Sequence, residues 1–452
     1  MGIGKSFFRN VIYLPIARYQ AGPVDRLLDD FLESQFQTST ALKESQAARL
    51  TALVDHARQH VPFYQDRLPD DFHSGTDPLQ ALPNLPCLLK SDLQASAGRL
   101  RSSADLGRLA VKTTGGSTGQ PVTLWKTREA WALELAATWR GYQWAGIAMG
   151  DKQARFWGIP HQPAARLKAR AIDFTCHRLR LSAFSFSDED MQGYLRSLRR
   201  FKPRYFYGYV SMLREFANYL LRTKQSLGFP LAATVTTSEV LTPADRSLMA
   251  EAFKAPVFNE YGCGELGSVA HECEAGRLHL TEENMIVEVL NQDVPAPAGE
   301  PGELVITEVN NLAFPLIRYR TGDYGTLSPE PCSCGRNLRV LDGIQGRAYD
   351  FIRNRDGRLF HGEFIMYIFE DIQRQGAGIK QFQVIQQDLD RFLIRIVATD
   401  DYDTRWEQVV MDRIREHVDP AATFVVEYPQ AIQRENSGKL RLIKGLGQVD
   451  GQ

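Results

Sequence analysis

Residues 113–121 read Thr-Thr-Gly-Gly-Ser-Thr-Gly-Gln-Pro, and this stretch carries residue types that bind phosphate. Glycine lets the backbone approach a ligand closely, while hydroxyls and free backbone amides bind phosphate oxygens. A Walker loop would place a lysine directly after its last glycine, but Gln120 stands there. The stretch therefore indicates either a phosphate-binding loop whose cation comes from elsewhere in the chain or an ordinary Gly/Ser/Thr turn.

Two further segments contain the side chains that a nucleotide site needs. NEYGCGELG (259–267) follows an apolar strand and contains Tyr261, Gly262 and Glu265. An aromatic ring can stack on a base, a glycine permits close approach, and a carboxylate can bind Mg²⁺. RYRTGDYG (318–325) places Asp323 in a turn, where a carboxylate can accept both hydroxyls of a ribose. Taken separately, each segment is also compatible with an ordinary turn.

Two more segments complete the pattern. TTSEVL (236–241) offers a polar strand end with Ser238 and Glu239, and RENSGKLR (434–441) presents Lys439 on a glycine-containing turn. Lys439 is the candidate for the missing cation, although a lysine in such a turn is also typical of a solvated surface. The occurrence of all five segments in this order fits a family signature better than a set of unrelated turns.

The combined pattern resembles the adenylate-forming (AMP-binding) superfamily. More narrowly, it is similar to the phenylacetate–CoA ligase branch and its CapK-type members, which are associated with polysaccharide loci. The resemblance runs from about residue 50 to beyond Lys439. It implies that Glu265 binds Mg²⁺ and that Lys439 stabilises the adenylation transition state. The implied ATP- and AMP-binding positions are Thr114, Gly115, Gly116, Ser117, Thr118, Gly119, Ser238, Glu239, Tyr261, Gly262, Asp323 and Arg347.

The resemblance implies that a small-molecule carboxylic acid attacks the α-phosphate of ATP and forms an acyl-adenylate, which then reacts with coenzyme A. Arg347 and Asp350, in GRAYD, match the hinge of the family. The chain departs from the family at Gly264, where many members have a hydroxyl residue, and at RNRDGRLFHGEF, which replaces the usual segment after the hinge. Two alternatives stay open: transfer to an amine or hydroxyl acceptor in polysaccharide biosynthesis, and a non-catalytic nucleotide-binding relative.

The segments HEC (271–273) and CSC (332–334) bring together one imidazole and three thiols. Four such ligands satisfy a tetrahedral Zn²⁺, and a closed set of this kind is structural because it leaves no open position. We therefore expect a structural zinc site formed by His271, Cys273, Cys332 and Cys334. The alternative is that the cysteines act as small hydrophobic residues.

Several aromatic residues lie where an acyl pocket is expected. Trp157 and His161, in FWGIPHQP, are candidates to line the substrate cavity, although for His161 the pattern favours an ordinary loop histidine. The residues Tyr205, Tyr207 and Tyr209 alternate at strand spacing and are candidates to border an acyl channel. In contrast, Trp139, Tyr142 and Trp144 fall on one apparent helix and are expected in the core.

Composition and pattern predict the fold class. The chain has 452 residues, a net charge of -1 and 43% hydrophobic residues, so we expect a globular protein of several domains that does not bind nucleic acid. No apolar run reaches the roughly 20 residues of a membrane span, and without an export signal we expect a cytoplasmic protein. The sequence is compatible with a homodimer but does not decide the oligomeric state.

Alternating apolar strands and helices between residues 105 and 345 predict βα units with mixed sheets. We expect an α/β + α+β protein in which a large adenylate-forming domain precedes a small, mobile C-terminal α+β domain. The predicted ranges are 1–104 for the N-terminal helical part of the large domain, 105–345 for the AMP-binding core and 346–452 for the small domain.

Overall fold

The structure is a computed structural model that describes most of the chain. The described residues are 6–69, 72, 77–113, 122–157, 163–182, 188–291, 293–347, 351–355, 359–361, 365, 368–369, 372–373, 375–433 and 441–446. Part of the predicted site lies outside these ranges, namely Thr114, Gly115, Gly116, Ser117, Thr118, Gly119, Asp350 and Lys439. His161 also lies outside them.

The chain divides into two compact units. Unit 1 comprises Met1–Thr321 and Gly325–Ile344, and unit 2 comprises Gly322–Tyr324 and Gln345–Gln452. The three ranges predicted from the sequence remain a proposal about the domain boundaries. In the part of the chain that the structure describes, no helix is both long enough and apolar enough to cross a bilayer.

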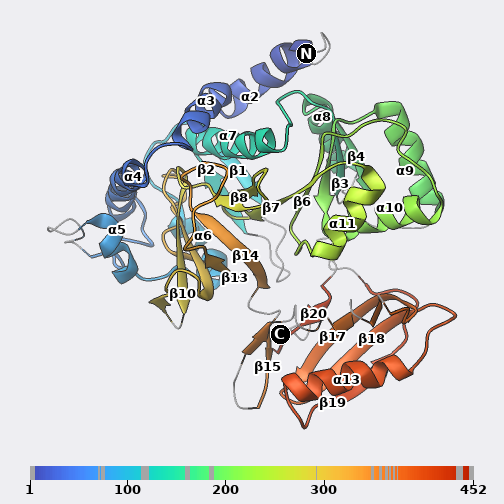
Figure 1. The fold of residues 1–452 in the computed structure, drawn as a ribbon. Helices are drawn as coiled ribbons and strands as arrows, with labels where there is room; N and C mark the ends of the chain where they lie inside the picture. Colours follow the sequence, from blue (N-terminus) through green and yellow to red (C-terminus); the bar gives the residue numbers. More distant parts are fainter. Residues whose placement is uncertain are drawn as a thin grey trace. The chain divides into compact units, whose positions relative to one another are not determined.

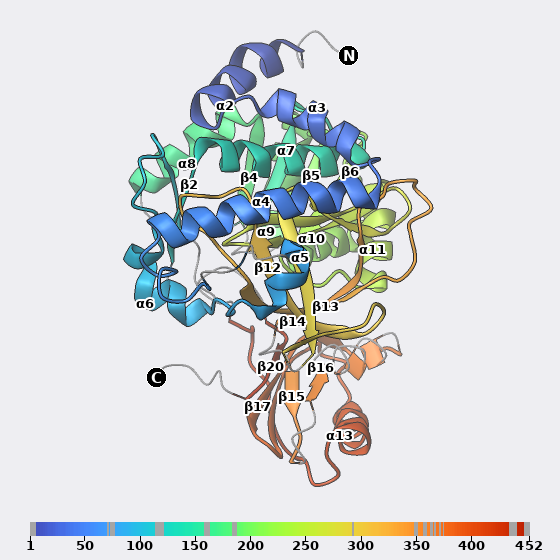
Figure 2. The ribbon, with the colours of Figure 1, turned by 90° about the vertical axis from the view of Figure 1, so that its left-hand side faces the viewer.

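The N-terminal region of unit 1 is helical. The 22-residue helix α4 (Ser39–His60) begins where the Thr38 side chain accepts a hydrogen bond from the Ala41 amide at 3.3 Å. Its apolar residues, including Leu50 and Val54, pack into the largest core of the protein. Figure 2 shows α4 running across unit 1. The other segments are η1 (Phe8–Tyr13), α2 (Leu14–Gln20), α3 (Val24–Ser34), α5 (Pro78–Ala81), η2 (Leu82–Asn84) and α6 (Lys90–Leu100).

A mixed sheet with the strand order β11-β10-β12-β13-β14-β9-β8-β7-β6-β5-β3-β4 forms the centre of unit 1. Its parallel half consists of β3 (Gln153–Trp157), β4 (Arg178–Ser182), β5 (Tyr205–Tyr209), β6 (Ala233–Thr237) and the start of β7 (Val257–Cys263). The remaining strands are β8 (Gly267–Glu272), β9 (Leu278–Leu280), β10 (Met285–Asn291), β11 (Val294–Pro295), β12 (Pro301–Glu308), β13 (Tyr319–Leu327) and β14 (Val340–Arg347). This architecture confirms the predicted large α/β part.

Helices cover both faces of the parallel strands (Figure 1). Helix α7 (Arg128–Trp144) packs on the face that carries Tyr205, Tyr207 and Val235. The opposite face, with Phe156 and Phe206, packs against α9, α10 and α11. The expectation that Trp139, Tyr142 and Trp144 lie in the core is confirmed, because all three side chains are buried. Besides α7, the helices of this half are α8 (Pro163–Thr175), α9 (Asp188–Phe201), α10 (Val210–Arg222) and α11 (Pro243–Phe253).

Unit 2 is a smaller α+β fold, as predicted. Strands β17 (Ile379–Asp388) and β18 (Arg391–Ala398) form an antiparallel hairpin, and the sheet order is β19-β18-β17-β20. Helix α13 (Arg405–His417) packs against this sheet through Trp406, Val410 and Ile414. The other strands are β15 (Phe351–Arg353), β16 (Leu359–His361), β19 (Thr423–Glu427) and β20 (Ile443–Lys444).

A buried ion network holds the base of the predicted phosphate loop. That loop connects β1 (Ala110–Thr113) and β2 (Thr123–Lys126), which pair antiparallel. Lys126 Nζ lies 2.8 Å from Glu134 Oε2 on α7 and 2.7 Å from Glu308 Oε1 on β12. It also donates a hydrogen bond to the Leu266 carbonyl at 3.2 Å.

The charges of this network stabilise one another in the interior. Although burial disfavours the charged forms, the two carboxylates raise the pKa of Lys126, and the neighbouring lysines lower the pKa of Glu134 to about 2. Gly267 makes room for this packing, because a Cβ there would lie 2.4 Å from Glu134 Cδ, and its φ is +95°. A side chain at residue 267 would therefore push Glu134 out of the network.

We predict that Lys126→Met lowers the free energy of unfolding by about 3–5 kcal/mol, because it leaves buried carboxylates without a counter-charge. Urea unfolding measures this loss. The matched control is Lys112→Met, since the Lys112 side chain is 34% exposed and its Nζ lies 2.9 Å from Glu134 Oε1. The control variant should lose less than about 1 kcal/mol. Equal losses in the two variants would contradict the role assigned to Lys126.

Candidate functional site

Glu265 lies in the tight turn between β7 and β8. Its carboxylate is buried, Oε2 accepts a hydrogen bond from Cys263 Sγ at 3.0 Å, and Oε1 lies 4.0 Å from Lys90 Nζ at the start of α6. Because Lys126 binds the carbonyl of the next residue, Leu266, the network described above fixes this turn beside the base of the phosphate loop. The sequence analysis missed Lys90, whose only signal is its place at a helix start after a proline-rich segment.

The neighbouring residues of β7 depart from regular pairing. Tyr261 pairs with Ala270, but Gly262 pairs with Ser268, so the register shifts between Tyr261 and Gly262. The Tyr261 side chain is buried in the main core of unit 1. A Cβ at Gly262 would lie 3.3 Å from the Gly267 carbonyl oxygen, so a larger residue would strain the hairpin that carries Glu265.

Ser238 and Glu239 directly follow β6, at the carboxyl end of the parallel strands. Ser238 has a φ of +69°, a left-handed conformation that is uncommon for a residue with a side chain. The Glu239 carboxylate accepts hydrogen bonds from the Ser211 amide at 2.6 Å and from the Ser211 hydroxyl at 3.0 Å. It therefore caps the start of α10, a structural role that the sequence analysis did not foresee.

For the remaining predicted residues, the structure describes the positions only in part. Asp323 is buried on β13. Arg347 is the last residue of β14, and the structure describes its backbone only. Asp350 and Lys439 lie outside the described residues, as does the phosphate loop itself. The roles assigned to these residues thus stay predictions.

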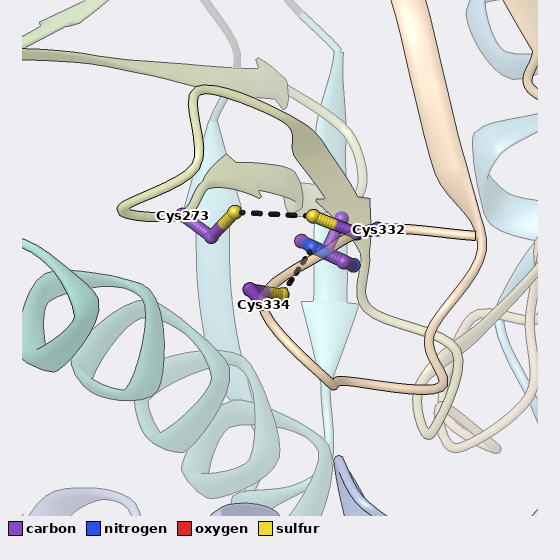
Figure 3. Close-up of side chains that lie close together, drawn as sticks. Cys273, Cys332 and Cys334 are labelled. Carbon is purple, nitrogen blue, oxygen red and sulfur yellow. Dashed lines mark hydrogen bonds between the residues drawn. The ribbon is translucent and has the colours of Figure 1, made fainter. Parts of the chain in front are cut away.

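Three cysteines and a histidine come together at one end of β8 and β9. The ligand atoms of Cys273, His279, Cys332 and Cys334 all lie within 4.8 Å of one another. Figure 3 shows the three cysteine side chains converging, with Cys273 Sγ and Cys332 Sγ 3.7 Å apart. Two thiolates on one tetrahedral zinc ion would lie about 3.8 Å apart, given Zn–S bonds of about 2.3 Å. The geometry therefore fits such an ion.

The histidine of this cluster is held in the tautomer that a metal needs. His279 Nδ1 lies 3.0 Å from the Leu338 carbonyl, so it donates its proton there and leaves Nε2 bare, 3.2 Å from Cys334 Sγ. Although burial opposes ionisation, hydrogen bonds from Arg336 lower the pKa of Cys334. A bare imidazole nitrogen beside a thiol with a lowered pKa is a favourable start for binding a metal cation.

The structure corrects one member of the predicted ligand set, because His279 takes the place of His271. The two residues are direct partners across β8 and β9. The His271 ring packs edge-on against Tyr142 and Trp144, and its Nε2 lies 3.8 Å from Glu260 Oε2. Burial lowers the pKa of His271 to about 3, so the ring is neutral. The HEC spacing suggested His271, but cross-strand pairing brings in His279.

Glu260 is a buried acid that the sequence analysis also missed. It lies on β7 under α7, where Oε1 accepts from Ser268 Oγ at 3.1 Å and Oε2 accepts from Tyr142 OH at 3.4 Å. Burial raises its pKa to about 7 and outweighs these hydrogen bonds. Its only sequence signal is its position next to Tyr261. At neutral pH this carboxyl group is therefore only partly ionised.

Comparisons with known proteins agree with this architecture. Residues 352–445 match the family model of the CapK C-terminal domain. The chain is 23% identical to Protein CapK of Staphylococcus aureus, over 80% of this chain and 80% of that protein. It is 27% identical to the phenylacetate-coenzyme A ligase of Thermus thermophilus, over 69% of this chain and 71% of that protein.

A solved structure extends the likeness to the whole fold. The crystal structure of 2-hydroxyisobutyryl-CoA ligase in the postadenylation state matches 91% of this chain and 90% of that chain, with a TM-score of 0.69 and 19% identity. The fold is thus that of an adenylate-forming ligase. In sequence, the chain is similar to CapK and to the phenylacetate–CoA ligases, and its C-terminal part matches the CapK C-terminal domain.

We predict that Glu260→Gln stabilises the protein at pH 8 but not at pH 5. A raised pKa means that stability is lost as pH rises from the ordinary value of 4.5 through about 7. The neutral amide of glutamine removes this loss of folding free energy. The loss reaches about 3 kcal/mol, because each pKa unit corresponds to about 1.4 kcal/mol. Urea unfolding at both pH values measures the difference. The exposed Glu416→Gln is the control, and an equal effect of Glu260→Gln at the two pH values would contradict the assignment.

Proposed function

We propose that this protein is an acid–CoA ligase that activates a small-molecule carboxylic acid with ATP and passes the acyl group to coenzyme A. The observation that carries the proposal is the buried ion network, which joins the base of the phosphate loop to the turn holding Glu265. The relative from Thermus thermophilus is named a phenylacetate-coenzyme A ligase, and the matched crystal structure contains 2-HIB-AMP. Both names support the same chemistry for this chain.

In the first half-reaction, a carboxylate oxygen of the acid attacks the α-phosphorus of ATP, and the bond to pyrophosphate breaks. The loop 113–121 would bind the phosphates through its amides and hydroxyls. Asp323 would accept the ribose hydroxyls, while Tyr261 and the Ser238–Glu239 segment would contact adenine. Glu265 would hold Mg²⁺, which neutralises phosphate charge when bound. Lys439 would stabilise the charge that develops on the oxygens.

In the second half-reaction, the thiolate of coenzyme A attacks the acyl carbonyl and AMP leaves. We propose that residues 346–452 move about a hinge at Arg347 and Asp350, so that Lys439 serves only the first step. Because both ATP and coenzyme A are substrates, we place the reaction in the cytoplasm. The segment RNRDGRLFHGEF differs from the usual family segment after the hinge. We therefore retain a second candidate acceptor, namely an amine or hydroxyl in polysaccharide biosynthesis.

We predict that the protein catalyses acid-dependent ATP–pyrophosphate exchange and that Lys439→Ala lowers the exchange rate about 100-fold or more. The control is Lys380→Ala, which removes an exposed lysine on β17 and should keep the rate. Formation of an acyl-CoA that depends on coenzyme A, measured by mass spectrometry, identifies the acceptor. Exchange without any thioester would favour an amine or hydroxyl acceptor. Absence of exchange with every acid would point to a non-catalytic relative.

We also propose that the cluster of Cys273, His279, Cys332 and Cys334 binds a structural Zn²⁺. Four ligands leave no open position for a substrate. The site would clamp the loop between β13 and β14 to the end of β8, because Cys332 and Cys334 come from that loop. Support comes from the thiol spacing and from the bare His279 Nε2.

We predict about one zinc ion per chain by elemental analysis of the purified protein. His279→Phe should reduce the zinc content to less than half, whereas His271→Phe should retain it. Both substitutions keep an aromatic ring against Trp144, which packs edge-on against both histidines. Circular dichroism checks that each variant is folded. Loss of zinc in the His271 variant alone would restore the ligand set predicted from the sequence.

A further inference from the structure

Arg155 is a partly buried cation of unit 1 that forms no ion pair with a carboxylate of the described residues. On the α7 face of the sheet, it lies opposite Tyr207 on β5 and Arg180 on β4. Its Cζ is 4.3 Å from the centre of the Trp157 ring and 5.0 Å from that of Tyr207. Its Nε is buried without a hydrogen-bond partner, and no described carboxylate forms an ion pair with it. Two aromatic rings therefore hold the guanidinium, but no carboxylate among the described residues is paired with it.

The charged groups around Arg155 add to the excess of positive charge. Arg178 and Arg180 on the next strand share one carboxylate, that of Asp173, at 3.6 Å and 2.9 Å. Burial, together with these two neighbouring guanidinium groups, lowers the pKa of Arg155. A further acid that interacts with Arg155 electrostatically is Glu260, which is only partly ionised at neutral pH. The cluster thus contains three guanidinium groups and a single ion-paired carboxylate.

A partly buried guanidinium whose Nε is out of contact with water and without a hydrogen-bond partner is costly, and packing alone does not explain its retention. Methionine or leucine would fill the space between Trp157 and Tyr207 without this cost. Strongly perturbed buried charges concentrate at functional sites, where a ligand supplies the missing partner. The missing partner of Arg155 is an anion.

The position of Arg155 points to the acid substrate as the source of that anion. In parallel α/β sheets, ligands bind beyond the carboxyl ends of the strands. Arg155 lies two residues before the end of β3, and Tyr207 hydrogen-bonds to Thr237, the last residue of β6. Ser238, a proposed nucleotide contact, follows Thr237 directly. The cation is therefore close to the strand ends where the proposed acyl-adenylate would form.

We propose that Arg155 binds a second carboxylate at the far end of the substrate, so that this protein activates dicarboxylic acids. The guanidinium is planar and is held between aromatic rings, which suits the two parallel hydrogen bonds that a carboxylate accepts. Trp157 and Tyr207 would orient Arg155 rather than contact the reacting atoms. This inference rests on the proposed function, because it assigns the substrate class of the same site.

Equilibrium binding tests the proposal without requiring turnover. The full-length protein is titrated with malonate, succinate, glutarate and adipate, and with the monoacid of equal carbon number in each case. Isothermal calorimetry and quenching of tryptophan fluorescence give the affinities. The wild type should bind at least one diacid about 10-fold more tightly than its monoacid, and Arg155→Met should reduce this ratio to about 1. Arg155→Lys, which keeps the charge but loses the planar fork, should give an intermediate ratio.

The controls separate this proposal from the proposed function. Arg170→Met removes an exposed arginine of α8 and should keep the wild-type ratio. If circular dichroism shows that Arg155→Met is unfolded, the affinity ratios of diacid to monoacid in the wild type and in Arg155→Lys decide the outcome. Equal binding of diacids and monoacids by the wild type would overturn the proposal. If the protein binds inorganic phosphate tightly and this binding depends on Arg155, the dicarboxylate proposal is wrong and a phosphorylated acid is the better candidate substrate.

Exchange assays with the same paired acids complete the test. If the protein catalyses exchange with monoacids and Arg155→Met leaves that exchange rate unchanged, the proposed subsite is wrong while the ligase function stands. Selective diacid binding that depends on Arg155, without exchange for any acid, would overturn the ligase function while the subsite stands. Exchange with a diacid whose KM rises in Arg155→Met while kcat is retained would support both.

Discussion

The ion network around Lys126 is the constraint on which the candidate site depends. One ammonium group joins β2, α7, β12 and the turn after Glu265, so the phosphate loop and the proposed magnesium ligand share one anchor. Such a network is stable in the interior only while every member is present, because each charge compensates another. The rest of unit 1 supports it by packing α7 on the sheet, and Gly267 leaves the space that Glu134 occupies.

The α7 face of the sheet contrasts with that network. Around Lys126, the charges of lysines and carboxylates balance, whereas around Arg155 the described cations outnumber the described carboxylates. Balanced charges serve the fold, and an unbalanced charge beside the strand ends is better explained by a ligand. The Cys/His cluster is a third arrangement, in which three thiols and one imidazole nitrogen lie close enough together to bind a metal ion. In the proposals made above, the first cluster is neutralised within the protein, the second by an anionic ligand and the third binds a metal ion.

Local patterns were enough to propose most of the candidate site, and these assignments stay predictions. Glycine, hydroxyl and acidic residues in a fixed order marked the phosphate loop, Glu265 and Asp323, because those side-chain types suit a nucleotide. The proposed zinc ligands show where such reasoning fails. His271 is close to Cys273 in sequence, but β8 and β9 pair antiparallel, so His279 reaches the thiols while His271 packs against Tyr142. Pairing between strands cannot be read from spacing within one strand.

The sequence by itself determined the class of protein, the two-part fold and the residue types available for adenylation, because periodicity and motifs are local properties of the chain. Only the tertiary structure decided which groups meet. It assigned Glu239 to the start of α10, brought Lys90 near Glu265, and left the Nε of Arg155 without a hydrogen-bond partner among the described residues. These outcomes depend on contacts between distant segments, and burial then sets the charge of each group through the loss of water.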